Sequence, residues 1–169
     1  EKIACVSILP MMDFLGVNWP YKITGKTLNY TREYLIDQIA IYLGGRVGEK
    51  IFSATESTGA SADLQSATNI ALSIVMYYGL SRKDENRNRT YINDYGNVRE
   101  YLISNTKKEE LDKEVQEIID EGYELAEKIV LANKKLLEII AERLLEEILT
   151  GEQLEEICKH YESNGKTSE

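Results

Sequence analysis

The stretch STGASADLQSATNIALSIVMYYGL, Ser57 to Leu80, joins a polar turn to an amphipathic helix. Its apolar residues recur at helical spacing from about Ala62 to Tyr78, and Gly79 is a typical helix stop. Asp63 is the one acid in this stretch and lies near the predicted helix start. Helix electrostatics alone can explain an acid there, because the first turn has unpaired N–H groups and the positive end of the helix dipole. The alternative is a metal ligand.

A second helix precedes this one. Between Thr31 and Phe52, apolar residues recur four apart, which predicts a helix: Leu35, Ile39, Leu43, Val47 and Ile51. Small residues, Ala40, Gly44 and Gly48, form another row four apart. Because glycine inside a helix costs roughly 1 kcal/mol relative to alanine, this row predicts a close helical neighbour. Residues 31–80 are therefore expected to form paired helices.

Short strands are predicted near the N-terminus. Ile3–Leu9 and Leu15–Tyr21 are short, apolar or β-branched, and bounded by proline and glycine. We expect a small β element within residues 1–30.

Helices are predicted again at the C-terminal end, over residues 106–162. Thr106-x-x-Glu109 has the capping-box pattern and begins a long helix that reaches about Ala132. Asn133 breaks the pattern, a second apolar stripe follows, and Thr150-x-x-Gln153 caps a last short helix. The expected fold class is mainly α, a helical bundle with a small β element.

Composition limits the classes of function. The 169 residues suit a single domain over 1–169, and a net charge of −9 argues against nucleic-acid binding. Cys5 and Cys158 lack metal or disulfide spacing, which favours a reduced cytosolic setting, and no apolar run is long enough to span a bilayer. The one histidine, His160, is expected to have no catalytic role.

The segment IAIYLGGRVGEKIFSATESTGASADLQSATNIALSIVMYYGLS, Ile39 to Ser81, closely resembles the peptidase domain of FtsH-type ATP-dependent zinc metalloproteases. The family pattern is a helix ending G-G-R-x-A-E-E, then S-T-G-A-x-N-D-L-x-x-A-T and a helix ending Y-G-M-S. The likeness extends to Val6–Pro10, Phe14–Pro20 and Thr106–His160, and so covers nearly the whole chain.

The resemblance implies a zinc site. In the family, two histidines of an H-E-x-x-H helix and the aspartate of the S-T-G-A segment hold zinc, and the glutamate of H-E-x-x-H is the general base. Asp63 falls on the position of the third ligand. Glu49 matches an acid of the family and could support a zinc ligand by hydrogen bonding, although a solvated charge at a helix end is the alternative. The chain departs from the pattern at Ala62, which replaces asparagine, and at Gly48-Glu49-Lys50, which replaces Ala-Glu-Glu.

H-E-x-x-H itself is absent from this sequence, and so is its general base. Because the chain does not begin with methionine, we expect a truncation just after that motif; an inactive, degenerate relative is the alternative. The missing H-E-x-x-H helix is also a candidate neighbour for the row of Ala40, Gly44 and Gly48.

A substrate-docking strand is also implied. FLGVNWP resembles the edge strand along which family members bind an extended substrate, which assigns substrate binding to Phe14, Leu15, Gly16 and Val17. The alternative is that Phe14 and Trp19 simply belong to the core.

By resemblance, we expect the zinc endopeptidase domain of a membrane-anchored, ATP-driven protease that degrades unfolded or membrane proteins. Zinc would bind in the complete protein, and ATP and Mg would bind an ATPase module that precedes this region. A homo-hexamer on the cytoplasmic face of a bacterial inner membrane, or of an organellar membrane, is implied, with membrane attachment through an absent N-terminal segment. The chain alone is expected to be soluble and inactive. The rival hypothesis is a protease-derived pseudo-enzyme that serves as a helical oligomerisation or adaptor module.

Overall fold

The computed structural model describes residues 3–9, 17–20, 29–53, 55–83, 86–92 and 103–165. The chain divides into two compact units, one of residues 29–132 and one that combines residues 1–28 with 133–169. The mainly helical fold with a small β element is confirmed. A single domain over 1–169 stays a prediction.

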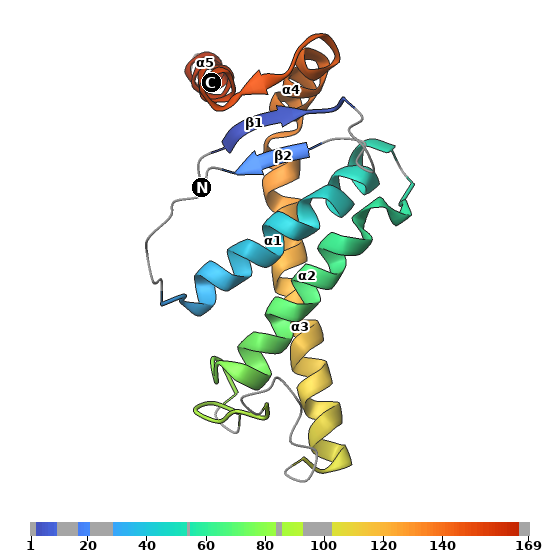
Figure 1. Cartoon of the computed structure of the whole chain (residues 1–169), viewed down its shortest axis with the longest axis vertical. Coiled ribbons are helices and arrows are strands. Elements are labelled where there is room, and N and C mark those ends of the chain that lie inside the picture. The colour runs from blue at the N-terminus through green and yellow to red at the C-terminus, as the bar shows by residue number, and fades with distance from the viewer. Residues whose placement is uncertain are drawn as a thin grey trace. The chain divides into compact units, whose positions relative to one another are not determined.

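The unit of residues 29–132 is helical (Figure 1). Its α-helices are α1 (Arg32–Gly48), α2 (Ser61–Leu72) and α3 (Asn105–Ala132). Two π-helical turns, η1 (Glu49–Ser53) and η3 (Ser73–Tyr77), extend α1 and α2, and a 3₁₀ turn, η2 (Thr58–Ala60), precedes α2. The predicted helices over 31–52, 62–78 and 106–132 are thus confirmed, with π-helical last turns in the first two.

Local signals explain where these helices begin and end. The Thr31 side chain accepts a hydrogen bond from the Tyr34 N–H at 3.2 Å and caps α1. The cap predicted for α3 is wrong, because Ser104, two residues before Thr106, accepts from the Lys107 N–H at 3.2 Å. Gly79 follows η3 with a φ of +63°, a left-handed conformation that suits glycine at a helix end.

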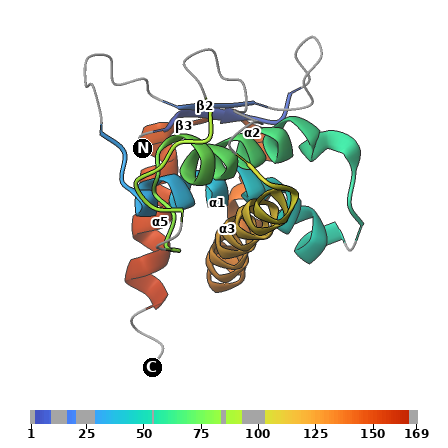
Figure 2. The ribbon, with the colours of Figure 1, turned by 90° about the horizontal axis from the view of Figure 1, so that it is seen from below.

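The core of this unit lies where α1, α2 and α3 meet, and Figure 2 looks almost along the axis of α3. Helices α1 and α3 approach each other closely at Gly122. A Cβ at Gly122 would lie within 3.0 Å of the Ile39 Cβ and 3.5 Å from the Ala40 N. A close helical neighbour was predicted from Ala40, Gly44 and Gly48, and at Ala40 that neighbour is α3.

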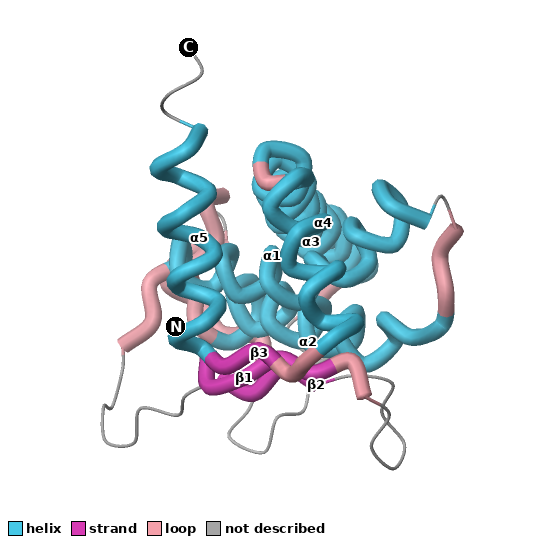
Figure 3. Tube along the Cα trace, turned by 90° about the horizontal axis from the view of Figure 1, so that it is seen from above, coloured by secondary structure: helices cyan, strands magenta, loops and turns pink. Residues whose placement is uncertain are grey.

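The second unit holds the sheet. Strands β1 (Ile3–Ser7), β2 (Val17–Pro20) and β3 (Leu149–Thr150) form an antiparallel sheet in the order β2-β1-β3 (Figure 3). The two predicted N-terminal strands are confirmed at Ile3–Ser7 and Val17–Pro20, whereas β3 was not predicted. Its two residues pair with Cys5 and Val6.

Helices α4 (Lys134–Glu146) and α5 (Gly151–Gly165) complete this unit, and Asn133 separates α4 from α3 as predicted. The capping box of α5 is confirmed in both directions. The Gln153 N–H donates to the Thr150 Oγ1 at 3.3 Å, and the Thr150 N–H donates to the Gln153 Oε1 at 2.8 Å.

Across the described ranges, no helix is long and apolar enough to cross a membrane.

Candidate functional site

Asp63 lies in the first turn of α2, and its side chain is exposed. The helix buries Ala67 and Ala71 on its other side, against the core of the unit. Among the described residues, no hydrogen bond or ion pair engages the Asp63 carboxylate, and no side-chain bond caps α2. The carboxylate is therefore accessible to a ligand, as well as favourably placed at the positive end of the helix dipole.

Glu49, the first residue of η1, binds the segment that leads to Asp63. Its Oε2 accepts the backbone N–H of Ser57 at 3.1 Å, and its Oε1 accepts the Ser57 hydroxyl. Arg46, one turn earlier, donates to the same Oε2 at 3.4 Å. Glu49 is thus a hydrogen-bonded group at the end of α1 and not merely a solvated charge.

These contacts favour the ionised form of Glu49. The hydrogen bond from the Ser57 hydroxyl, then that from the Ser57 N–H, and then the charge of Arg46 lower the pKa of the Glu49 carboxyl, and partial burial opposes them. Glu49 is therefore anionic at neutral pH, where it accepts both Ser57 donors.

The described part of the chain does not form a zinc centre. It contains no group of three or more His, Cys, Asp or Glu side chains that could hold a metal ion. The one histidine, His160, lies in α5, in the unit that does not contain Asp63. Catalytic zinc sites use three protein ligands, so Asp63 alone does not satisfy the metal.

A groove runs between α1 and α3 on the side of the small-residue row. It has a volume of about 480 Å³ and is lined almost entirely by apolar residues: Asp37, Ala40, Ile41, Gly44, Leu125, Ala126, Ile129 and Val130. A Cβ built at Gly44 or Gly48 would meet no described atom within 4 Å. The row is thus covered by α3 at Ala40 and open at Gly44 and Gly48.

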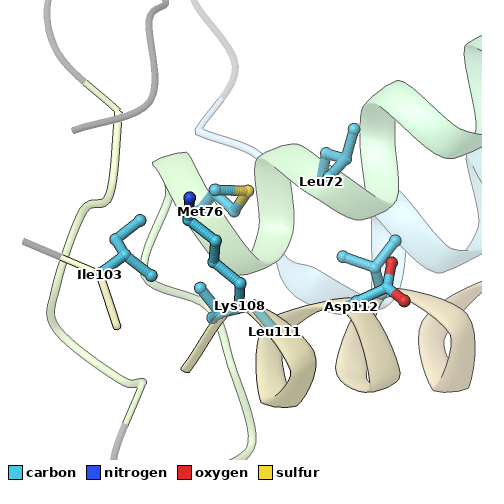
Figure 4. A pocket seen from close by; sticks show the side chains of 7 residues that line it. Leu72, Met76, Ile103, Lys108, Leu111 and Asp112 are labelled. Atoms are coloured by element: carbon cyan, nitrogen blue, oxygen red, sulfur yellow. The ribbon is translucent and has the colours of Figure 1, made fainter. Parts of the chain in front are cut away.

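A smaller apolar hollow of about 280 Å³ lies between the end of α2 and the start of α3 (Figure 4). Figure 4 shows Leu72 and Met76 on one side, and Ile103 and Leu111 on the other. Two charged residues, Lys108 and Asp112, also line it, and its described lining contains no histidine, cysteine or serine.

The residues assigned to substrate binding are only partly described. Phe14, Leu15 and Gly16 lie outside the described residues. Val17 begins β2, which pairs with β1 on one side and has no partner among the described strands on its other side. Substrate binding along this strand stays a prediction.

Sequence reasoning missed a buried polar network on α3. Glu114 is 3% exposed, and its carboxylate accepts the Ser81 hydroxyl and, at 2.7 Å, the Asn86 amide. The Asn86 Oδ1 in turn accepts the Tyr91 hydroxyl at 3.1 Å. A signal was available, because Glu114 has helical spacing to the apolar residues Leu111 and Ile118 and so falls on the buried face.

Comparison with known proteins places these features in a family. The model of peptidase family M41 matches residues 1–157. The chain belongs to peptidase family M41. The resemblance to FtsH-type proteases is thereby confirmed.

Curated relatives of this chain are named ATP-dependent zinc metalloproteases. The chain is 36% identical to the ATP-dependent zinc metalloprotease FtsH 4 of Synechocystis sp. over 173 residues, which cover 97% of this chain and 27% of that protein. It is 34% identical to the FtsH protease of Helicobacter pylori strain J99 (94% and 26% covered) and 38% identical to that of Bacillus subtilis strain 168 (77% and 22% covered). The chain thus spans about a quarter of the length of these curated relatives.

Proposed function

We propose that this chain is part of the peptidase domain of an ATP-dependent zinc metalloprotease, and that Asp63 is its carboxylate zinc ligand. The observation that carries the proposal is the position of Asp63. In a member of family M41, this acid of the S-T-G-A-x-x-D-L segment is exposed on the first turn of α2, without a protein partner among the described residues. Carboxylate oxygens are ordinary zinc ligands.

The remaining ligands would come from an H-E-x-x-H helix that is not in this sequence. We place that helix on the open part of the small-residue row, at Gly44 and Gly48. The apolar groove beside Gly44 supports this placement, because a helix with an apolar face can pack closely where side chains are missing. Bound zinc would activate water for hydrolysis of peptide bonds. No step of that hydrolysis is assigned to residues of this chain, since Asp63 alone does not form the centre.

The names of the relatives support a proposal for the partners. The FtsH proteins above are named ATP-dependent proteases, so the complete protein would use ATP and Mg in an ATPase module and cleave unfolded or membrane polypeptides. We further propose a homo-hexamer at the cytoplasmic face of a bacterial inner membrane, held there by a segment outside this sequence. An extended substrate would pair with β2, starting at Val17.

The rival function is a non-catalytic helical module that derives from a protease and acts in oligomerisation or as an adaptor. Such a module would need no H-E-x-x-H motif, and the 169 residues contain none. The retained S-T-G-A-x-x-D-L segment and the exposed Asp63 favour the peptidase, because a scaffold has no need of either.

The coding sequence upstream of Glu1 distinguishes the two. If it encodes H-E-x-x-H, the protein that includes it should bind one zinc per chain and cleave an unfolded test protein such as casein. If it does not, or if the extended protein binds no zinc, the module hypothesis replaces the peptidase.

A further inference from the structure

Ser57 is the residue that connects the end of α1 to the start of α2. Both of its hydrogen-bond donors bind a single carboxylate: the N–H donates to the Glu49 Oε2 at 3.1 Å, and the hydroxyl donates to the Glu49 Oε1. Two hydrogen bonds to one carboxylate fix the orientation of Ser57 relative to Glu49 as well as the distance between the two residues. Arg46 also donates a hydrogen bond to the Glu49 Oε2 at 3.4 Å, so the accepting carboxylate is itself held in place.

The same hydroxyl organises the turn on its C-terminal side. The Ser57 Oγ accepts the Gly59 N–H at 3.1 Å and thereby caps η2 (Thr58–Ala60). The Ser61 N–H then donates to the Thr58 carbonyl, and α2 begins at Ser61 without a break. Asp63 is therefore six residues from Ser57 along hydrogen-bonded backbone.

We propose that Ser57, held by Glu49, is the positioning residue for Asp63. This inference rests on the proposed function, because Asp63 needs a fixed position only if it binds a ligand. Glu49 then acts on Asp63 through Ser57, and not by a hydrogen bond to a zinc ligand. Glu49 holds Ser57, and Ser57 fixes the start of the turn that leads to Asp63. In this proposal neither Ser57 nor Glu49 would be a zinc ligand.

Hydrogen exchange on the 169-residue chain tests the anchoring. In Ser57→Ala and Glu49→Gln, the backbone N–H groups at position 57 and at Gly59 should exchange several-fold faster than in the unaltered chain. Ser57→Thr keeps both donors and the acceptor, and should keep the slow exchange. Glu56→Ala removes the neighbouring exposed acid, for which no bond to this segment is found among the described residues, and is the matched control. Unchanged exchange in Ser57→Ala and Glu49→Gln overturns the proposal.

Zinc affinity of the protein extended upstream to include H-E-x-x-H tests the positioning. Ser57→Ala and Glu49→Gln should weaken zinc binding roughly 10–100-fold in a chelator competition, the usual effect of losing a group that orients a ligand. Ser57→Thr should restore it. Faster exchange with unchanged zinc affinity would overturn the positioning role, because the bonds would then only stabilise the turn.

The two proposals fail in different ways. If Asp63→Ala leaves zinc affinity unchanged, Asp63 is not a ligand, and both proposals are overturned. If Asp63→Ala abolishes zinc binding and Ser57→Ala does not alter it, the proposed function stands and the positioning by Ser57 is overturned.

Discussion

Replacing Glu114 with alanine should destabilise the helical unit strongly. Glu114 is the buried acceptor of the polar network, and both donors that it binds are buried, with Ser81 3% and Asn86 1% exposed. The network fixes the segment after Gly79 to α3, since the Asn86 amide oxygen also accepts the buried Tyr91 hydroxyl. Without Glu114, the buried Asn86 amide loses this acceptor, and the Ser81 hydroxyl keeps the Lys83 carbonyl, at 3.2 Å, as its acceptor.

The size of the effect follows from the two bonds. A hydrogen bond to a charged group contributes about 1.5–3 kcal/mol, so two contribute about 3–6 kcal/mol, an upper bound because water can partly replace the carboxylate. We expect Glu114→Ala to lower the free energy of unfolding by about 3 kcal/mol. Glu114→Gln should cost less, about 1–3 kcal/mol, because one oxygen remains while its NH₂ group faces a donor.

Urea unfolding followed by circular dichroism measures the free energy. Exchange of the Tyr91 N–H, which donates to the Met76 carbonyl at 2.7 Å, reports locally on the same segment. The control is Glu117→Ala, which removes an exposed acid of the same helix that pairs with exposed Lys83 and should shift neither measurement noticeably. If Glu114→Ala were no more destabilising than Glu117→Ala, the network would not hold this segment to α3.

Three further predictions concern other parts of the chain. Gly151→Ala should destabilise the sheet unit by about 1–3 kcal/mol in thermal unfolding, because a Cβ there would lie only 3.0 Å from the Ile3 carbonyl carbon. The control is Gly45→Ala, whose Cβ would meet nothing within 4 Å and which should be neutral or stabilising by up to about 1 kcal/mol. The hydrogen bond from Arg32 lowers the pKa of Glu121 in the folded protein. The Arg32–Glu121 pair therefore stabilises the folded state fully above about pH 4.3, the ordinary pKa of glutamate, and this stabilisation is lost as pH falls through the lower pKa of the folded state. Glu121→Gln should remove this dependence and flatten that part of the acid unfolding curve. In the extended protein, Val17→Pro should reduce cleavage of an unfolded substrate and leave the circular dichroism spectrum unchanged; an equal loss of folding would argue against docking on β2.

The helices were predictable because their signals are local. Apolar residues four apart fix α1, and the reciprocal cap of Thr150 and Gln153 fixes the start of α5. The S-T-G-A-x-x-D-L segment also placed Asp63 correctly at the first turn of α2. Such features depend on residues within one or two turns of each other.

Features that depend on distant residues were not predictable. The strand β3 is only two residues long and exists because Leu149 and Thr150 pair with β1, more than 140 residues away in sequence. The close approach of α3 to α1 depends on Gly122, which has no distinctive pattern around it. The bonds from Ser57 to Glu49 likewise required the folded backbone, because the two residues are eight apart and separated by a change of direction.

Zinc stoichiometry tests directly whether Asp63 is a metal ligand. The measurement compares the 169-residue chain with the protein extended upstream through H-E-x-x-H, each with and without Asp63→Ala, and uses Glu56→Ala as the control for loss of one nearby charge. We expect no tight zinc in the 169-residue chain, one zinc per chain in the extended protein and in its Glu56→Ala variant, and loss of that zinc in Asp63→Ala. Tight zinc in the 169-residue chain alone, or full zinc in the extended Asp63→Ala protein, would contradict this expectation.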